Sequence, residues 1–546
     1  MHSVGGFAGS VNGIQKLFQY SRIWNSRSSR SSARILVLDL SPSRSRAYSN
    51  FPSAQISFPD KPDVFFDHPT GLFINNKFIE STGDEKLTTR NPATETDIAT
   101  FPCANWTDVN AAVKAARSAF DSVWRHMSGT DRGKLLTNLS ELLDQHKQYL
   151  GKVESLDTGK SIANVINEEI ADCVNVSRYY GGWADKIYGQ TIQPYKEKLA
   201  YTLREPYGVC GLIVPWNYPL MLSIWKLAPA LAAGNTVVLK SSELTPLSAS
   251  YLGHLITRAG FPPGVVNILS GGATTGEYLS RHPDVNKLSF TGSERIGKQI
   301  MRAAAENLVP VTLELGGKSA ALVFDDADIE QAVKWCHMGV MSNAGQICTA
   351  TSRIYIAHNI YEKFLRLLAE FTQVSSMKVS LNSGDFNQGP QISHDQMDKV
   401  NKYIQAGVSE GARLICGGQI TSEKGYYTQA TILADVKDNM IVATDEIFGP
   451  VVVCDSFSDT DEAVKRANSS SYGLAGAIFT LDITRALDVA RRLEAGMIWI
   501  NSSNDSDFRV PFGGYKRSGF GRELGEYALQ AYTQEKAVHI NMGVRL

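Results

Sequence analysis

Three residues that lie far apart in the sequence have types that together could attack and hydrolyse a carbonyl compound. The first, Cys348, lies in Asn343-Ala344-Gly345-Gln346-Ile347-Cys348-Thr349, where small neighbours leave a substrate room to approach the sulfur. A cysteine thiolate is a good nucleophile and forms covalent intermediates. A lone cysteine is more often an inert buried thiol, so Cys348 by itself does not define a site.

The other two candidates are a carboxylate and an amide. Glu314 ends an apolar run in Thr312-Leu313-Glu314-Leu315-Gly316-Gly317-Lys318, where burial would raise its pKa and suit it to act as a general base. Asn217 lies between two prolines in Val214-Pro215-Trp216-Asn217-Tyr218-Pro219, so a rigidly held amide could donate to an oxyanion. A solvated carboxylate and an ordinary turn asparagine are the alternatives.

Two segments fit the binding of a dinucleotide, although no G-x-G-x-x-G pattern follows a strand. In the segment 290–297, Gly292 would let the backbone approach a pyrophosphate, and the helix that opens there would favour the anion. Lys240 and Glu243 end another apolar run. A carboxylate there can accept the ribose hydroxyls of NAD and would repel the 2′-phosphate of NADP. Helix caps are the alternative interpretation of both segments.

Buried strands that alternate with helices must position these residues. Short apolar runs predict strands at 209–214, 236–239, 265–269, 287–290, 311–315 and 320–324. Helical periodicity predicts helices at 109–120, 221–233, 246–259 and 295–306. This alternation favours an α/β fold in which helices cover both faces of a parallel sheet.

Two further segments, 199–204 and 536–542, alternate with period two and predict exposed strands. Exposed strands invite pairing with another subunit.

Composition excludes several classes of protein. The 546 residues carry a net charge of −1, so neither nucleic acid nor an anionic membrane is an expected partner. The seven cysteines are scattered without a CxxC, which argues against a disulfide framework and against a metal site. Apolar runs stay well short of the ~20 residues that a membrane span needs.

Residues 1–50 differ from the rest of the chain. They hold six Arg and one Lys against a single acid, Asp39, and are rich in Ser. A basic, acid-poor, amphipathic start is the composition of a mitochondrial transit peptide, and Arg46-Ala47-Tyr48-Ser49 resembles a processing site with cleavage after Tyr48. We therefore expect a mitochondrial protein. A disordered leader on a cytoplasmic protein is the alternative.

Taken together, the motifs resemble the aldehyde dehydrogenase superfamily, in its non-acylating, broad-substrate branch. The resemblance runs from Gly71-Leu72-Phe73-Ile74-Asn75 to the C-terminus, essentially the whole chain after the leader. The segments that carry it are Pro215-Trp216-Asn217, Lys240-x-x-Glu243, Phe290-Thr291-Gly292-Ser293, Leu313-Glu314-Leu315-Gly316-Gly317-Lys318, Gly345-Gln346-Ile347-Cys348, Glu446-Ile447-Phe448-Gly449-Pro450 and Pro511-Phe512-Gly513-Gly514-Tyr515-Lys516. Each motif is weak evidence by itself, but the occurrence of all of them in this order is hard to explain by chance.

The resemblance implies a role for each matching residue. Cys348 would be the nucleophile, Glu314 the general base, and Asn217 with the backbone N–H of Cys348 the oxyanion hole. Residues implied to hold the cofactor are Trp216, Lys240, Glu243, Gly292, Ser293, Gly297, Glu446 on the nicotinamide ribose, and Phe448 beside the nicotinamide. Those implied to line an aromatic substrate tunnel are Tyr218, Trp225 and Phe512, with Ile347 and Thr349 flanking the nucleophile.

The resemblance also implies the domain organisation, with a Rossmann-like domain that lacks the usual glycine pattern. Residues 70–183 and 206–316 would form the dinucleotide-binding domain, and 317–529 an α/β catalytic domain. Residues 184–205 and 530–546 would form a small β element for oligomerisation, which implies homodimers or homotetramers.

The implied reaction is the NAD-dependent oxidation of a small-molecule aldehyde to a carboxylic acid through a thiohemiacetal and a thioester, with NADP as a second possible cofactor. Asp505 and Asp507 near the tunnel mouth could favour a cationic substrate such as betaine aldehyde, but Arg509 weakens that case and a solvated loop is favoured.

Three competing interpretations are an acylating enzyme that uses coenzyme A, a thioesterase-like hydrolase and a catalytically silent family member. Glu314 argues against the first, because acylating relatives commonly lack this carboxylate. The cofactor residues argue against the second, and the intact set of Cys348, Glu314 and Asn217 argues against the third.

Overall fold

The structure is a computed structural model that describes residues 51–59, 61–375, 388–420 and 424–546. The leader predicted over residues 1–50 lies outside the described residues. The strands predicted between 209 and 324 and the four predicted helices are all present, with ends that differ by a few residues. The predicted α/β fold is confirmed.

An eight-stranded sheet forms the first of two large sheets, in the order β23-β13-β12-β9-β10-β11-β3-β4. Its five central strands, β13 to β11, are parallel, and antiparallel strands pair at both edges. The strands are β3 (Leu72–Ile74), β4 (Lys77–Ile79), β9 (Val209–Ile213), β10 (Thr236–Lys240), β11 (Val266–Leu269), β12 (Lys287–Thr291), β13 (Val311–Glu314) and β23 (Gly519–Phe520). All five residues of β10 are buried, as expected for a central parallel strand.

Helices cover both faces of this sheet because successive side chains of a strand point to opposite faces. Cys210 and Leu212 of β9 pack in the apolar cluster that includes α7 and α8, whereas Val209 and Ile213 pack with α2 and α10. The helices of this part of the chain are α2 (Trp106–Ser122), α3 (Gly129–Gln145), α4 (Lys147–Thr158), α5 (Ile162–Asn164), the π-helical turn η4 (Val165–Ile170), α6 (Ala171–Trp183), α7 (Pro219–Ala232), α8 (Leu247–Ala259), α9 (Ala273–Arg281) and α10 (Glu294–Glu306).

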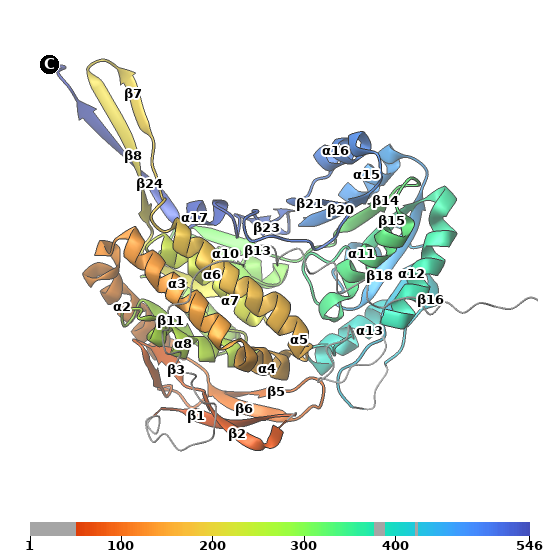
Figure 1. Cartoon of the computed structure of the whole chain (residues 1–546), viewed down its shortest axis with the longest axis horizontal. Helices are drawn as coiled ribbons and strands as arrows, with labels where there is room; N and C mark the ends of the chain where they lie inside the picture. Colours follow the sequence, from red (N-terminus) through yellow and green to blue (C-terminus); the bar gives the residue numbers. More distant parts are fainter. Residues whose placement is uncertain (1–50, 60, 376–387, 421–423) are drawn as a thin grey trace, which may run out of the picture. The chain divides into compact units, whose positions relative to one another are not determined.

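The second large sheet has seven strands in the order β16-β17-β18-β15-β14-β20-β21, all parallel except β16. They are β14 (Ala320–Val323), β15 (Arg353–Ala357), β16 (Arg413–Cys416), β17 (Thr431–Ala434), β18 (Val451–Phe457), β20 (Ala475–Phe479) and β21 (Met497–Ile500). Helices again lie on both faces (Figure 1).

The helices of this second part pack in separate clusters on the two faces, so its core is built in the same way as the first. They are α11 (Ile329–Met341), α12 (Tyr361–Ser375), α13 (His394–Ser409), α14 (Ile441–Thr444), α15 (Thr460–Asn468), α16 (Ile483–Arg492) and the 3₁₀ turns η5 (Ser342–Gly345) and η6 (His358–Ile360). The two sheets fall in the two segments predicted as separate domains, except that β23 pairs with β13 of the first sheet. The domain boundaries themselves stay a prediction.

Smaller elements complete the described chain. Three antiparallel pairs and two short helices lie outside the large sheets. They are β1 (Ser53–Phe58) with β2 (Lys61–Pro69), β5 (Lys86–Arg90) with β6 (Asp97–Pro102), β19 (Tyr472–Gly473) with β22 (Tyr515–Lys516), the 3₁₀ turn η3 (Trp124–His126) and α17 (Tyr527–Ala531).

The two segments of period two form strands, as predicted, and the structure pairs them in one antiparallel sheet. β7 (Thr191–Tyr195), β8 (Lys198–Pro206) and β24 (Thr533–Asn541) pair in the order β24-β8-β7, next to the C-terminus (Figure 1). Apolar side chains on these strands, such as Ile192 and Ile540, stay exposed in the single chain. The outer edge of β24 pairs with no strand among the described residues.

Candidate active site

The candidate residues of the first sheet gather at one edge because the carboxyl ends of parallel strands lie together. Glu314 is the last residue of β13, and Lys240 is the last residue of β10. Asn217 follows β9 and comes just before Pro219, which opens α7. The preorganised φ of a proline suits the first turn of a helix, so the loop that carries Asn217 is short and stiff.

The thiol comes from the other sheet, on a turn between α11 and β15. Three consecutive residues, Asn343, Ala344 and Gly345, have positive φ angles of 48°, 53° and 74°. A non-glycine residue in this region costs roughly 1–2 kcal/mol, so the surrounding contacts must hold the turn in place. A Cβ at Gly345 would collide with the backbone of Gly449, which explains why residue 345 of the turn is a glycine.

Asn217 joins the two sheets through this turn. Its Nδ2 donates to the carbonyl oxygen of Gln346 at 3.0 Å, and Asn343 Nδ2 donates back to the carbonyl oxygen of Asn217 at 3.1 Å. Asn217 is only 4% exposed, and its Oδ1 has no hydrogen-bond partner among the described residues. The side-chain amide of Asn217 is therefore fixed against the backbone two residues before Cys348. A rigid amide donor at this place suits an oxyanion formed at the sulfur.

Cys348 is partly exposed, although the surrounding protein desolvates its sulfur. Burial raises the pKa of the thiol, and the charges of Glu446 and Glu314 raise it further, which places both carboxylates near the sulfur. Hydrogen bonds from the backbone N–H groups of Cys348 and Thr349 oppose this rise in pKa. The loop after Glu314 also runs against the thiol segment, since a Cβ at Gly317 would collide with the carbonyl oxygen of Cys348.

Glu314 is 2% exposed, and neither carboxylate oxygen has a partner among the described residues. Burial, followed by the charge of Glu523, raises its pKa well above the ordinary value, while Lys226 and Arg522 act in the opposite direction. Lys226 is fully buried in an ion pair with Glu523 and also donates to Ser289 Oγ at 3.2 Å. The sequence did not single out this pair, because 297 residues separate its members.

Glu446 and Phe448 reach the same edge from the loop that precedes β18. The backbone N–H of Gly317 donates to Glu446 Oε1 at 3.0 Å. Burial raises the pKa of Glu446 to about 7. The rings of Phe448 and Trp216 meet edge to face at 5.3 Å, and both residues are partly exposed. This pair supplies an apolar wall beside the carboxylate.

The remaining predicted cofactor residues lie on the same edge of the first sheet, whereas the thiol comes from the turn before β15. Lys240 is buried, and its Nζ lies 3.4 Å from Glu243 Oε2, whose side chain is half exposed. Ser293 caps α10, with its Oγ accepting from the N–H of Ile296, and Gly292 directly precedes this cap. Gly297 lies in the first turns of α10 against Leu315. A row of candidate cofactor contacts therefore runs from β10 across β9 to β12.

Two of the predicted tunnel residues contact each other, and all three belong to the large apolar cluster of the first sheet. Tyr218, Trp225 and Phe512 belong to one apolar cluster that also includes Cys348. The rings of Trp225 and Phe512 meet at 5.1 Å. At the predicted mouth, Arg509 pairs with Asp507 at 2.7 Å, while Asp505 is exposed. The carboxylate of Asp507 is therefore largely neutralised by its own loop.

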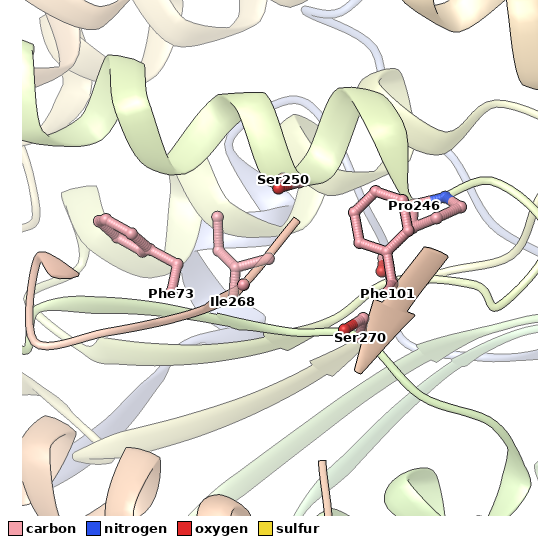
Figure 2. Close-up of a pocket in the computed structure, with 8 residues that line it drawn as sticks. Phe73, Phe101, Pro246, Ser250, Ile268 and Ser270 are labelled. Atoms are coloured by element: carbon pink, nitrogen blue, oxygen red, sulfur yellow. The ribbon is translucent and has the colours of Figure 1, made fainter. Parts of the chain in front are cut away.

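A small cavity lies apart from this site. The cavity in Figure 2, lined by Phe73, Phe101, Ser270 and Ser250 of α8 among others, has about 10 Å³, the room of a single water. None of its lining residues belongs to the thiol site. No cluster of histidine, cysteine and acidic residues in the described ranges could hold a metal ion. Among the described helices, none is long and apolar enough to cross a membrane.

Comparison with known proteins matches residues 78–538 to the family described as "Aldehyde dehydrogenase family". An aldehyde dehydrogenase from Aspergillus niger is 46% identical over 482 residues, covering 88% of this chain and 97% of that protein. The chain belongs to the aldehyde dehydrogenase family. Human retinaldehyde dehydrogenase 3 is also 46% identical, over 87% of this chain and 93% of that protein.

Solved structures of family members agree with this assignment. The NAD+ complex of an aldehyde dehydrogenase from Bacillus cereus superposes with a TM-score of 0.85 at 44% identity, covering 87% of this chain and 97% of that one. Betaine aldehyde dehydrogenase from Staphylococcus aureus, in complex with NAD+, gives a TM-score of 0.85 at 36% identity over 87% and 95%. The aldehyde dehydrogenase fold therefore extends over essentially all of the described chain.

The electrostatics of the thiol generate a prediction. The substitution Glu446→Gln removes a negative charge that raises the pKa of Cys348, so more thiolate should be present at a given pH. Alkylation of Cys348 by iodoacetamide at about pH 8 should become several-fold faster, since each pKa unit is worth up to tenfold in thiolate. Mass spectrometry of the peptide that contains Cys348 measures the rate.

A neighbouring carboxylate provides the control for this experiment. Asp445 is adjacent in sequence and its Oδ2 accepts from Tyr403, whereas the acids with the largest effect on the pKa of Cys348 are Glu446 and Glu314. Asp445→Asn should therefore leave the alkylation rate unchanged. An unchanged or slower rate in Glu446→Gln would contradict the predicted effect of Glu446 on the thiol.

Proposed function

We propose that this protein oxidises an aldehyde to a carboxylic acid with NAD as the oxidant and Cys348 as the nucleophile. One observation carries the proposal: the partly exposed Cys348 thiol, on a turn that Asn217 holds, is within reach of the charge of the buried Glu314 carboxylate, which has no hydrogen-bond partner among the described residues. A nucleophile, a base and an amide donor at one point are what acyl chemistry on a thiol requires.

The first step is attack of the Cys348 sulfur on the carbonyl carbon. The thiol loses its proton to solvent, the S–C bond forms as the C=O π bond opens, and the carbonyl oxygen of the substrate takes the negative charge of the thiohemiacetal anion. The second N–H of the Asn217 amide and a backbone N–H at Cys348 would stabilise this oxygen. Removal of one such donor typically costs roughly 10²–10³ in rate.

The residues present fit a dinucleotide. The half-exposed Glu243 carboxylate beside the buried Lys240 ammonium suits a ribose diol, and the capped N-terminus of the 13-residue helix α10 suits a pyrophosphate. Glu446, oriented by the N–H of Gly317, would hold the second ribose next to the aromatic wall of Phe448 and Trp216. When bound, NAD supplies an oxidised pyridine ring that accepts the hydride from the substrate carbon.

Glu314 completes the reaction by activating water. Its raised pKa makes this carboxylate a stronger base than a solvated one, and it accepts a proton from water while the new C–O bond forms and the C–S bond of the thioester breaks. The acid leaves, the Cys348 sulfur is restored, and the proton passes from Glu314 to solvent. This carboxylate supports a hydrolytic product over acyl transfer to coenzyme A.

The proposed roles predict two separable defects. Cys348→Ser should abolish NADH formation from aldehydes, because the first covalent bond cannot form. Glu314→Gln should retain about one early turnover and then lose most of its steady-state rate, because the thioester accumulates. Absorbance at the NADH band, followed from the first seconds with NAD or NADP, measures both variants.

The outcomes that contradict this proposal are equally distinct. Normal turnover in Cys348→Ser would exclude Cys348 as the nucleophile. Suppose that Glu314→Gln gives no early burst of NADH although calorimetry shows normal binding of NAD. Glu314 would then be needed for a step before thioester hydrolysis.

We further propose that the sheet of β7, β8 and β24 pairs subunits, to give a homodimer or a homotetramer. The exposed apolar side chains and the outer edge of β24, which pairs with no described strand, support this role. The mass in solution should therefore be two or four times that of one chain by light scattering. A monomeric mass at micromolar concentration would rule this out.

We also propose that residues 1–50 direct the protein to mitochondria, on the composition of the leader. Residues 1–50 fused to a fluorescent protein should accumulate in mitochondria of eukaryotic cells, and the same fusion with its six arginines changed to glutamine should not. A diffuse cytoplasmic signal from the unchanged leader would contradict the proposal.

A further inference from the structure

The turn that carries the thiol needs support, and the loop of Asn217 supplies only part of it. Asn343, Ala344 and Gly345 are three consecutive residues in the left-handed region of backbone space. L-residues enter this region singly and not in runs, because the Cβ comes too close to the following carbonyl oxygen. Such a run persists only where surrounding contacts hold it. These contacts therefore decide where the sulfur of Cys348 lies.

The segment directly before α13 supplies further contacts to this turn. Gln391 Nε2 donates to the carbonyl oxygen of Ala344 at 3.1 Å. The N–H of Ile392 donates to Gln346 Oε1 at 2.9 Å, and Gln346 Nε2 donates to the carbonyl oxygen of Pro390 at 3.3 Å. The sequence did not indicate these hydrogen bonds, because 47 residues separate Gln391 from Ala344.

This segment, residues 389–392, is itself fixed and forms a brace for the turn. The N–H of Gln391 donates to the carbonyl oxygen of Tyr426 at 2.8 Å. A Cβ at Gly389 would come within 2.9 Å of the carbonyl oxygen of Gly159, so the brace passes close to the end of α4. A residue that positions another must be held in this way, since a loosely supported one leaves the site imprecise.

The side chain of Gln391 is buried in a way that its role as a donor explains. Gln391 is 0% exposed, and its Oε1 has no hydrogen-bond partner among the described residues. An unsatisfied buried oxygen costs free energy, which an apolar side chain of the same size would avoid. An apolar side chain, however, could not donate to the carbonyl of Ala344. The amide of Gln391 is therefore better explained by this hydrogen bond than by the filling of space.

We propose that Gln391 is a positioning residue for the nucleophile: its amide keeps Ala344 in the left-handed conformation and so keeps the Cys348 sulfur within reach of the substrate carbonyl. The inference rests on the proposed aldehyde oxidation, in which Cys348 attacks. Gln391 takes no part in bond formation. Loss of its N–H lets the turn relax, so a smaller fraction of the protein is competent to react. NAD binding changes little, because Glu243 and α10 belong to the first sheet.

The rate of the first turnover tests the position of the sulfur separately from thioester hydrolysis. With saturating NAD, and with the protein in excess over propanal, hexanal or benzaldehyde, NADH formation reports only attack by Cys348 and hydride transfer. Gln391→Met keeps an unbranched side chain of similar length but has no N–H to donate. It should lower the first-turnover rate about tenfold or more, while the Kd of NAD from calorimetry stays within about twofold.

Gln388 offers a matched control three residues earlier in the chain. Its Nε2 donates to the carbonyl oxygen of Thr428, which is not part of the thiol turn. Gln388→Met removes the same kind of amide from the same stretch of chain. The first-turnover rate of this variant should stay within about twofold of that of the unchanged protein.

A second substitution separates positioning through the turn from general damage to the fold. Glycine adopts positive φ angles without the steric cost that Ala344 bears. Ala344→Gly should therefore raise the first-turnover rate of Gln391→Met several-fold, but it should not raise the rate of the unchanged protein, whose turn is already held. A merely structural loss at Gln391 would not be recovered in this way, because replacing a buried alanine by glycine removes packing and adds chain entropy.

The outcomes separate the positioning role from the proposed function. An unchanged first-turnover rate in Gln391→Met overturns the positioning role, as does an equal fall in Gln388→Met. A rate that Ala344→Gly does not recover at all also overturns it. If the unchanged protein oxidises none of the three aldehydes, the proposed function fails and the inference falls with it.

A further variant covers the case in which Gln391→Met has a much lower thermal midpoint than the unchanged protein. Gln391→Asn keeps the amide but is one methylene too short to reach the carbonyl oxygen of Ala344. It should lower the first-turnover rate in the same direction, and Ala344→Gly should again recover part of the loss. An unchanged rate in Gln391→Asn would overturn the positioning role.

Discussion

The hydrogen bonds between Asn217 and the turn at Asn343–Gln346 hold the segment that carries the Cys348 sulfur in its place. They join the carboxyl edge of one parallel sheet to a turn of the other, and each segment donates to the other's backbone. Asn343 and Ala344 in that turn adopt positive φ angles that an isolated peptide would avoid. Because the bonds are buried, an unsatisfied partner would be costly, so the turn is held in one conformation. The position of the sulfur follows from that constraint.

Burial sets the acid–base properties of the same region. Desolvation is the largest cause of the raised pKa of Cys348, of Glu314 and of Glu446, since each charged form loses water. This makes Glu314 a stronger base than a solvated carboxylate and makes the thiolate harder to form. The buried Lys226–Glu523 pair next to Glu314 adds two charges that shift the pKa of Glu314 in opposite directions. The site therefore depends on groups that no local motif contains.

The residues predicted to line the substrate tunnel combine aromatic packing with a carboxylate. Trp225 and Phe512 form the wall, and the carboxylate of Asp172 orients the indole through its N–H. A buried tryptophan usually finds a partner for this N–H, and a backbone carbonyl would satisfy it without charge. The use of a carboxylate at this point places a charged group against an aromatic cluster.

The order of residues along the chain was enough to predict the elements and the chemical types at their ends. The periodicity of apolar residues predicted the strands from 209 to 324 and the helices between them. It also predicted the strands β8 and β24. Local hydrophobic periodicity is informative because it reflects which face of an element is buried. Local motifs also indicated Cys348, Glu314 and Asn217 as candidates, since residues at strand ends can be recognised from their neighbours in the chain.

Which of these side chains meet is a property of the folded molecule. The contact of Asn217 with Gln346 spans 129 residues, and that of Trp225 with Asp172 joins two helices with no shared motif. Such contacts, and the pKa shifts that burial causes, depend on the packing of distant elements, which no local pattern specifies.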